Sequence, residues 1–224
     1  SLLTHDEVVT LFHEFGHCLH YLLTSVPYPS LAGGHGVPWD GIELPSQLLE
    51  YWSWQTETLP LISRHHETGE ALPPALIANL KRAKLFQSAL HRIRQLQFAL
   101  FDMQLHTQVQ PALNTPQDIQ KLLDEVRAKT SLIPSSPLNR FQHSFSHIFA
   151  GGYSAGYYSY QWAEVLASDA FESFQKNGVL DAATGAKYRD SILSQGGSRD
   201  FMALYKSFKG RKPSIDALLA EYGL

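Results

Sequence analysis

Apolar residues recur at helical spacing along most of the chain, and this pattern constrains the fold more than any other feature. Between Thr4 and Leu23 the apolar positions lie three, four or seven residues apart, as on one face of a helix. Thr4 and Glu7 fit a capping box, in which each side chain bonds a backbone amide of the other residue. No stretch alternates apolar and polar residues over a useful strand length. The sequence therefore predicts an all-α fold.

Proline and glycine residues divide the helical pattern into segments. The pattern predicts helices from residue 4 to just before Pro27, and then at 44–57, 75–109, 116–129, 155–176, 182–194, 199–208 and 214–222. Residues 27–42 are rich in glycine and proline and are expected to form a long loop. The segment 131–137 is expected to be irregular, because it contains two prolines.

The composition excludes several classes of protein. The 224 residues include 18 Lys+Arg and 21 Asp+Glu, a formal charge of −3, which gives no electrostatic footprint for nucleic acid or for an anionic membrane surface. Apolar residues make up 44 %, enough for a folded core, but no apolar run is long enough to span a bilayer. The single cysteine, Cys18, excludes an intrachain disulfide and fits a reducing compartment. We expect a cytoplasmic protein with neither nucleic acid nor a membrane among its partners.

Residues 13–17 read HEFGH and match the motif H-E-x-x-H inside the first predicted helix. Positions i and i+4 of a helix share a face, so His13 and His17 can reach one ion. Zinc accepts neutral imidazole nitrogen and keeps a position for water in catalytic sites. Glu14 is then placed to take a proton from that water. Gly16 costs the helix roughly 1 kcal/mol relative to alanine, which indicates close packing beside the ligands.

A third protein ligand has to come from another part of the chain. The metzincin extension requires glycine at the position of His20 and histidine at that of Leu23, so it does not apply. Glu43 opens the second predicted helix, after a loop long enough to turn the chain back. Glu50 lies seven residues later on the same helix face. It is the competing carboxylate, and it could also orient a ligand from outside the metal shell or be an ordinary surface residue.

Two other interpretations of these residues remain. A di-iron carboxylate bundle uses Glu-x-x-His from two helices, and residues 14–17 match that pattern once, with no second match in the chain. A non-catalytic, zinc-stabilised binding module is the other alternative. Structural zinc sites are generally rich in cysteine, whereas this chain has one.

Several blocks of sequence together resemble one known family. These blocks are HEFGHCLH at 13–20, ELPSQLLEYW at 43–52, FAGGYSAGYYSYQWAEVL at 149–166 and FKGRKPSIDALL at 208–219. They are similar to the M3 family of zinc oligopeptidases, the relatives of thimet oligopeptidase, and the resemblance covers essentially the whole chain. It implies a multi-helix zincin-type catalytic domain, one Zn²⁺ ion per chain and hydrolysis of peptide bonds in short oligopeptides.

The resemblance also implies roles for individual residues. It makes His13, His17 and Glu43 the zinc ligands and Glu14 the catalytic base, and it assigns substrate and transition-state contacts to His147, Tyr153, Tyr157 and Tyr160. The three tyrosines follow i, i+4, i+7 spacing and would line one helix face, a pattern that core packing also produces. Gly152 would allow the chain to approach a substrate closely. A phenol can donate a hydrogen bond to an oxyanion without carrying charge.

The predicted first helix begins almost at the first residue, and no initiator methionine precedes it. Chain termini are usually poorly ordered, and members of the family are much longer. We therefore expect residues 1–224 to be the C-terminal part of a metallopeptidase catalytic domain, with the N-terminal remainder of the protein as a natural partner. Alone, the chain is expected to self-associate through an uncovered apolar face and to cleave peptides slowly.

Overall fold

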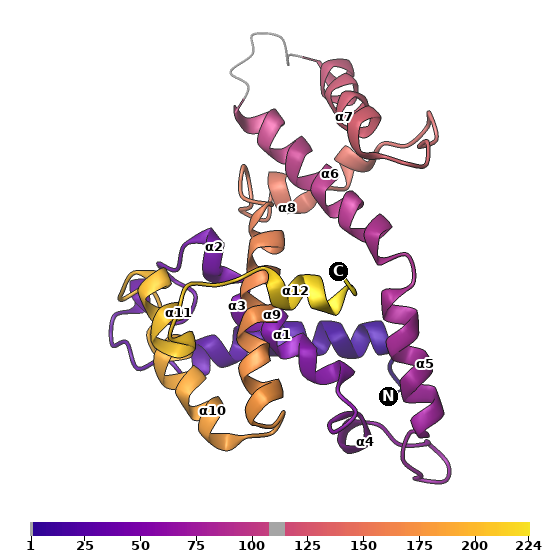
Figure 1. Ribbon diagram of the computed structural model, residues 1–224. Helices are drawn as coiled ribbons and strands as arrows, with labels where there is room; N and C mark the ends of the chain where they lie inside the picture. Colours follow the sequence, from indigo (N-terminus) through magenta and orange to yellow (C-terminus); the bar gives the residue numbers. More distant parts are fainter. Residues whose placement is uncertain (1, 108–114) are drawn as a thin grey trace. The chain divides into compact units, whose positions relative to one another are not determined.

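The computed structural model describes residues 2–107 and 115–224, which are predominantly helical (Figure 1). In these ranges the only β pairing is one antiparallel bridge between Arg64 and Ala71, so the all-α prediction is confirmed. None of the described helices has the length and apolarity required to cross a membrane. Contacts divide the chain into two compact units: unit 1 is Ser1–Phe86 with Trp162–Leu224, and unit 2 is Gln87–Gln161.

Unit 1 contains most of the helices. They are α1 (His5–Leu22), α2 (Trp39–Ile42), α3 (Leu44–Glu50), α4 (Leu59–Ile62), α5 (Pro74–Leu85), α10 (Ala182–Tyr188), α11 (Phe201–Lys209), α12 (Asp216–Glu221) and all but the first turn of α9 (Ser159–Asn177). Short 3₁₀ turns lie at Pro29–Leu31 and Tyr51–Trp54, and a π-helical turn at Arg189–Leu193 follows α10.

Helix α1 begins and packs as its sequence predicts. Thr4 accepts the amide of Glu7 at 3.3 Å, and the Thr4 amide donates to the Glu7 carboxylate at 2.7 Å, which completes the capping box. Two-thirds of the way along, Gly16 lies directly against the first turn of α3. A Cβ atom on Gly16 would lie 2.4 Å from the carbonyl oxygen of Pro45 and 2.6 Å from the Cα of Ser46. The two backbones therefore touch, and the close packing expected from this glycine is confirmed.

The core of unit 1 joins α3 to α9, α10 and α11. Tyr51 stacks on Phe171 with 4.7 Å between ring centroids, and Trp52 meets the same ring edge-on at 5.0 Å. A buried carboxylate, Asp169 of α9, accepts the Tyr205 hydroxyl at 2.6 Å and two Arg211 nitrogens at 2.6 and 3.0 Å. Because a buried charge is costly unless it is paired, these contacts fix α11 and the residues after it against α9.

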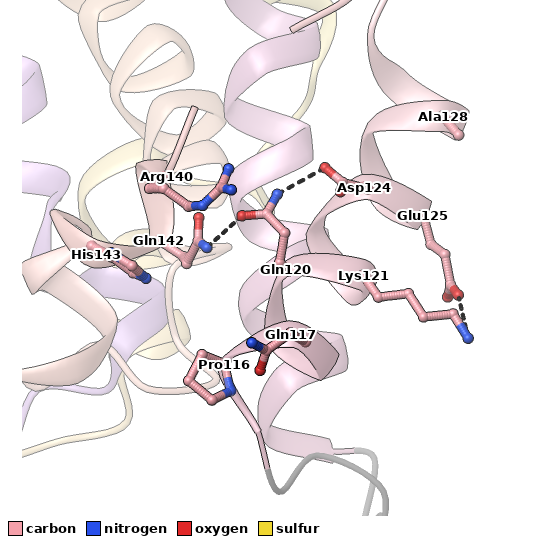
Figure 2. A pocket seen from close by; sticks show the side chains of 10 residues that line it. All are labelled: Pro116, Gln117, Gln120, Lys121, Asp124, Glu125, Ala128, Arg140, Gln142 and His143. Atoms are coloured by element: carbon pink, nitrogen blue, oxygen red, sulfur yellow. Dashed lines mark hydrogen bonds and ion pairs between the residues drawn. The ribbon is translucent and has the colours of Figure 1, made fainter. Parts of the chain in front are cut away.

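Unit 2 contains α6 (Ser88–Thr107), α7 (Pro116–Thr130) and α8 (Ser146–Phe149). Helices α6 and α7 lie side by side (Figure 1) over a core that includes Phe101, Leu123 and Ile148. A groove of about 540 Å³, lined mostly by polar and charged residues, follows α7 (Figure 2). Within it the Gln142 amide donates to Gln120 at 2.7 Å, and Gln120 donates to Asp124 at 3.0 Å. This chain of side chains attaches the 3₁₀ turn at residues 141–143 to α7.

One helix prediction and one loop prediction in the first half of the chain need correction. Helix α3 ends at Glu50 and passes into the 3₁₀ turn, so the predicted helix at 44–57 is too long. The Trp52 carbonyl accepts the Thr58 hydroxyl and the Gln55 amide rather than an amide one full α-turn later. The predicted loop at 27–42 contains the short helix α2 as well as a 3₁₀ turn.

Two long predicted helices are also interrupted. The helix predicted at 75–109 is two helices, α5 and α6, separated at Gln87, which has a φ of 54°; its last two residues, 108 and 109, lie outside the described ranges. The helix predicted at 155–176 begins only at Ser159, because Ala155 also has a φ of 54°. The buried Asp102 accepts the amides of Ala155 and Tyr157, both at 2.9 Å, and so stabilises this turn in place of a helical one.

Candidate metal centre

Three of the predicted site residues converge in unit 1. His13 and His17 lie one turn apart on α1, and Glu43 lies at the junction of α2 and α3. The Glu43 Oε2 atom lies 3.3 Å from His13 Nε2 and 3.2 Å from His17 Nε2. One potential ligand atom from each residue falls within 4.8 Å of the others. Two imidazole nitrogens and one carboxylate oxygen are a donor set that zinc prefers, and catalytic zinc sites commonly use three protein ligands with water as the fourth.

The carboxylate of Glu43 is completely buried and held in one orientation. Ser46, in the first turn of α3, donates its hydroxyl to Glu43 Oε2 at 2.8 Å and to the Glu43 carbonyl at 2.9 Å. A fully buried carboxylate requires hydrogen bonds and a positive partner. The contact of Gly16 with Pro45 and Ser46 brings α1 close enough for the two histidines to face this carboxylate.

Glu50 contacts His13 from the other side of the imidazole. Its Oε1 atom lies 2.6 Å from His13 Nδ1, which leaves Nε2 directed toward Glu43. The sequence left three roles open for Glu50. The geometry favours a carboxylate that orients a histidine, an arrangement that is common around metal-bound histidines. Burial opposes protonation of His13, but hydrogen bonds to Glu43 and Glu50 outweigh it and raise its pKa to about 10. The two carboxylates on either side of His13 thus favour its positively charged form.

Two neighbours on α1 differ sharply in their surroundings. Glu14, next to His13, is exposed to solvent. His20 is 3 % exposed, and burial together with the nearby His17 lowers its pKa to about 4. His20 is therefore a neutral residue on the buried face of α1, outside the group of possible ligands.

The remaining predicted site residues gather in unit 2. The His147 ring on α8 lies 6.1 Å from the rings of Tyr153 and Tyr160 and 5.8 Å from that of Tyr157, measured between centroids. Tyr160 lies 5.1 Å from Tyr153 and 5.0 Å from Tyr157. The expectation that the tyrosines line one helix face is wrong, since only Tyr160 belongs to α9. The turn before α9 nevertheless brings the rings into one aromatic cluster.

The backbone around this cluster is shaped by a few specific contacts. Gly152 has a φ of 85°, in the left-handed region that favours glycine. The Tyr153 amide then donates to the His147 carbonyl at 3.0 Å. Tyr157 is 8 % exposed, and its hydroxyl lies 3.1 Å from Gln95 Oε1 and donates to it. Burial raises the pKa of Tyr157 to about 12, against the opposing effect of Arg94, so its phenol is neutral at physiological pH.

Two residues that shape these sites were not found from the sequence. Asp102 holds the turn that carries Tyr157, and Ser46 orients Glu43. Asp102 interrupts an apolar run, FALFDMQL at residues 98–105, and a charge in such a position could have indicated a buried role. Ser46 carries no comparable signal.

Comparisons with known proteins place these residues in a wider group. The model of peptidase family M3 matches residues 1–224. Oligopeptidase A of Escherichia coli K12 is 50 % identical over 224 residues, covering 100 % of this chain and 33 % of that protein. Organellar oligopeptidase A of Arabidopsis thaliana is 45 % identical over 228 residues, which cover 100 % of this chain and 29 % of that protein. Saccharolysin of Saccharomyces cerevisiae is 42 % identical over 230 residues, which cover 100 % of this chain and 31 % of that protein.

The chain thus spans about a third of the length of these curated relatives, and its sequence aligns from end to end. The resemblance seen in the four sequence blocks is confirmed, as is the helical fold that it implied. The expected self-association and the expected slow cleavage by the chain alone stay predictions.

Proposed function

Because the chain belongs to peptidase family M3, we propose that it forms the catalytic centre of a zinc metallopeptidase that hydrolyses short oligopeptides. The observation that carries this proposal is the convergence of His13, His17 and Glu43 within 4.8 Å. The fit of that donor set to zinc supports it, as do relatives whose names describe oligopeptidases. Short peptides and the remainder of the longer protein are the proposed partners, and the single cysteine favours the cytoplasm.

In this proposal His13, His17 and Glu43 hold the metal, and Glu50 and Ser46 orient two of these ligands. Bound zinc supplies Lewis acidity and lowers the pKa of water. Glu14 takes a proton as the water oxygen forms a bond to the carbonyl carbon of the peptide. Glu14 then gives that proton to the amide nitrogen as the C–N bond breaks, which leaves a carboxylic acid and an amine. Its exposed position on α1 leaves it accessible to both reactants.

The aromatic cluster supplies the proposed hydrogen-bond donors for the oxyanion. The Tyr157 hydroxyl is already bonded to Gln95, which fixes its ring beside Tyr160. We expect Tyr160→Phe to lower kcat by about 10²–10³-fold with little change in KM, because an oxyanion bond forms mainly in the transition state. Steady-state kinetics on a quenched fluorescent peptide measures both constants. Tyr158→Phe, at an exposed neighbouring position, is the matched control. An unchanged kcat in both Tyr160→Phe and Tyr157→Phe would assign the cluster to core packing.

Metal analysis combined with a peptidase assay tests the proposed function. We expect one zinc ion per chain, cleavage of a short quenched peptide, loss of cleavage with a chelator and recovery on adding zinc. Bound zinc with no cleavage, in the chain and in the longer protein, would favour a non-catalytic zinc-stabilised module. Two iron ions per chain would favour a di-iron carboxylate protein.

A further inference from the structure

The two histidines and Glu43 are connected by a long loop, residues 23–42, which we call the ligand loop. It contains only short helical turns of its own, at Pro29–Leu31 and in α2. Loops of this length in compact domains are uncommon and are usually functional. A second segment of unit 1, residues 194–201, lies against the ligand loop; we call it the docking segment. It follows the π-helical turn and leads into α11.

Hydrogen bonds attach the first half of the ligand loop to the docking segment. The Ser194 carbonyl accepts both the amide and the hydroxyl of Ser25, each at 2.9 Å. Six residues further along the loop, the Leu31 carbonyl accepts the amide of Gly197 at 2.8 Å. The two chains are thus bonded at two points, although about 170 residues separate Ser25 from Ser194 along the sequence.

Glycines bring the two backbones into direct contact in the middle of the loop. Gly196 has a φ of 49°, and a Cβ atom there would lie 2.1 Å from the carbonyl oxygen of Leu31. A Cβ atom on Gly197 would lie 2.5 Å from the carbonyl carbon of Gly36 and 2.6 Å from the carbonyl oxygen of His35. Real Cβ atoms do not approach backbone so closely, so a side chain at either glycine requires the ligand loop to move.

The last contact lies immediately before the third potential ligand. Gly41, two residues before Glu43, packs against the ring of Phe201, and a Cβ atom on Gly41 would lie 2.4 Å from that ring. Phe201 is itself buried at the start of α11. The docking segment therefore contacts the ligand loop near its beginning, its middle and its end.

We propose that the docking segment positions Glu43 relative to His13 and His17, with Gly196 and Gly197 as its main positioning residues. This inference rests on the proposed function. Glu43 and α1 are fixed to each other from one side by the contact of Gly16 with α3. The docking segment fixes the other side, because it sets the path of the chain that leads into Glu43. Neither glycine belongs to the converging group of His13, His17 and Glu43, so in this proposal both act through the placement of a ligand.

The variant Gly197→Ala tests this inference, with Gly185→Ala as the matched control. Gly185 has no heavy atom within 4 Å of the position its Cβ would take. Zinc affinity is measured by competition with a chromophoric chelator, and cobalt substitution reports ligand geometry through its visible absorption bands. We expect Gly197→Ala to bind zinc about 10–100-fold more weakly, with altered cobalt bands. Gly185→Ala is expected to match the unmodified protein in both.

A purely structural role for Gly197 predicts a lower Tm with unchanged zinc affinity and cobalt bands in the folded protein, and that result would overturn the proposal. If Gly197→Ala does not fold, the variant Ser25→Ala tests the positioning role instead. It removes one hydrogen bond to Ser194 and is expected to weaken zinc binding about two- to tenfold, whereas Ser25→Thr restores the hydroxyl and the affinity. Equal zinc affinity in both Ser25 variants contradicts the proposal.

Hydrogen exchange separates a failure of this inference from a failure of the proposed function. In protein treated with a chelator, Gly197→Ala is expected to accelerate exchange of amides in the ligand loop, whichever metal the site binds. If the unmodified protein binds no zinc, the proposed function fails, and unchanged exchange in the loop would then reject the docking segment as well. If it binds zinc and the Gly197 variant binds it equally, only the positioning role is rejected.

Discussion

Replacing Glu14 with glutamine is expected to abolish nearly all peptide hydrolysis while zinc stays bound. The amide keeps the size of the side chain but cannot accept the proton of the attacking water, and general acid–base catalysis contributes about 10²–10⁴-fold to the rate. Zinc binding is expected to persist because Glu14 is outside the converging group of His13, His17 and Glu43. The measurements are kcat/KM on a quenched peptide and zinc content, both on a form of the protein that shows activity.

The matched control for this substitution is Glu57→Gln. It makes the same chemical change at another exposed glutamate, and it is expected to leave kcat/KM and zinc content unchanged. Substantial turnover by Glu14→Gln at neutral pH would show that another group is the base. Loss of zinc together with activity would show instead that Glu14 supports the metal.

Replacing Glu43 with glutamine is expected to weaken zinc binding more than any other carboxylate substitution in the chain. Glu43 is the only carboxylate in the converging group and is fully buried. Breaking a buried charge pair costs about 3–5 kcal/mol, which corresponds to about 10²–10³-fold or more in the zinc dissociation constant. The same substitution is expected to lower the pKa of His13 from its raised value, because one of its two carboxylate partners is lost. Chelator competition and histidine NMR titration measure the two effects.

The variant Glu50→Gln shows which of the two carboxylates, Glu43 or Glu50, contributes more to zinc affinity. Glu50 contacts His13 Nδ1 at 2.6 Å but lies outside the converging group. Loss of a residue that only orients a ligand is expected to weaken zinc binding by about 10–100-fold. A greater loss for Glu50→Gln than for Glu43→Gln would reverse their roles.

The parts of the fold that depend on short-range patterns were predictable from the sequence. Helix α1, its capping box and the placement of His13 and His17 on one face all follow from spacings of three or four residues. The close contact at Gly16 was indicated by the free-energy cost of a glycine within a helix, without reference to residues distant in the sequence. Helical spacing alone did not decide between Glu43 and Glu50 as the third ligand, because carboxylates seven residues apart lie on the same helix face.

The breaks in the long helices could not be predicted, because they depend on residues distant in the sequence. Ala155 adopts a positive φ where Asp102, 53 residues earlier, accepts its amide. Alanine favours helix on its own, so the local pattern indicated a helix through this turn. The contact between the ligand loop and residues 194–201 is of the same kind: the glycines are visible in the sequence, but their partners are not.

The contact of Gly16 with Pro45 and Ser46 has a consequence for the choice of ion. Where side chains separate two helices, a change of rotamer can absorb a small displacement, but here backbone meets backbone with no side chain between. This contact therefore sets a lower limit to the distance between α1, which carries the histidines, and the start of α3 beside Glu43. The group that this contact brings together offers two imidazole nitrogens and one carboxylate oxygen, a donor set that disfavours Ca²⁺, which takes six to eight oxygen ligands.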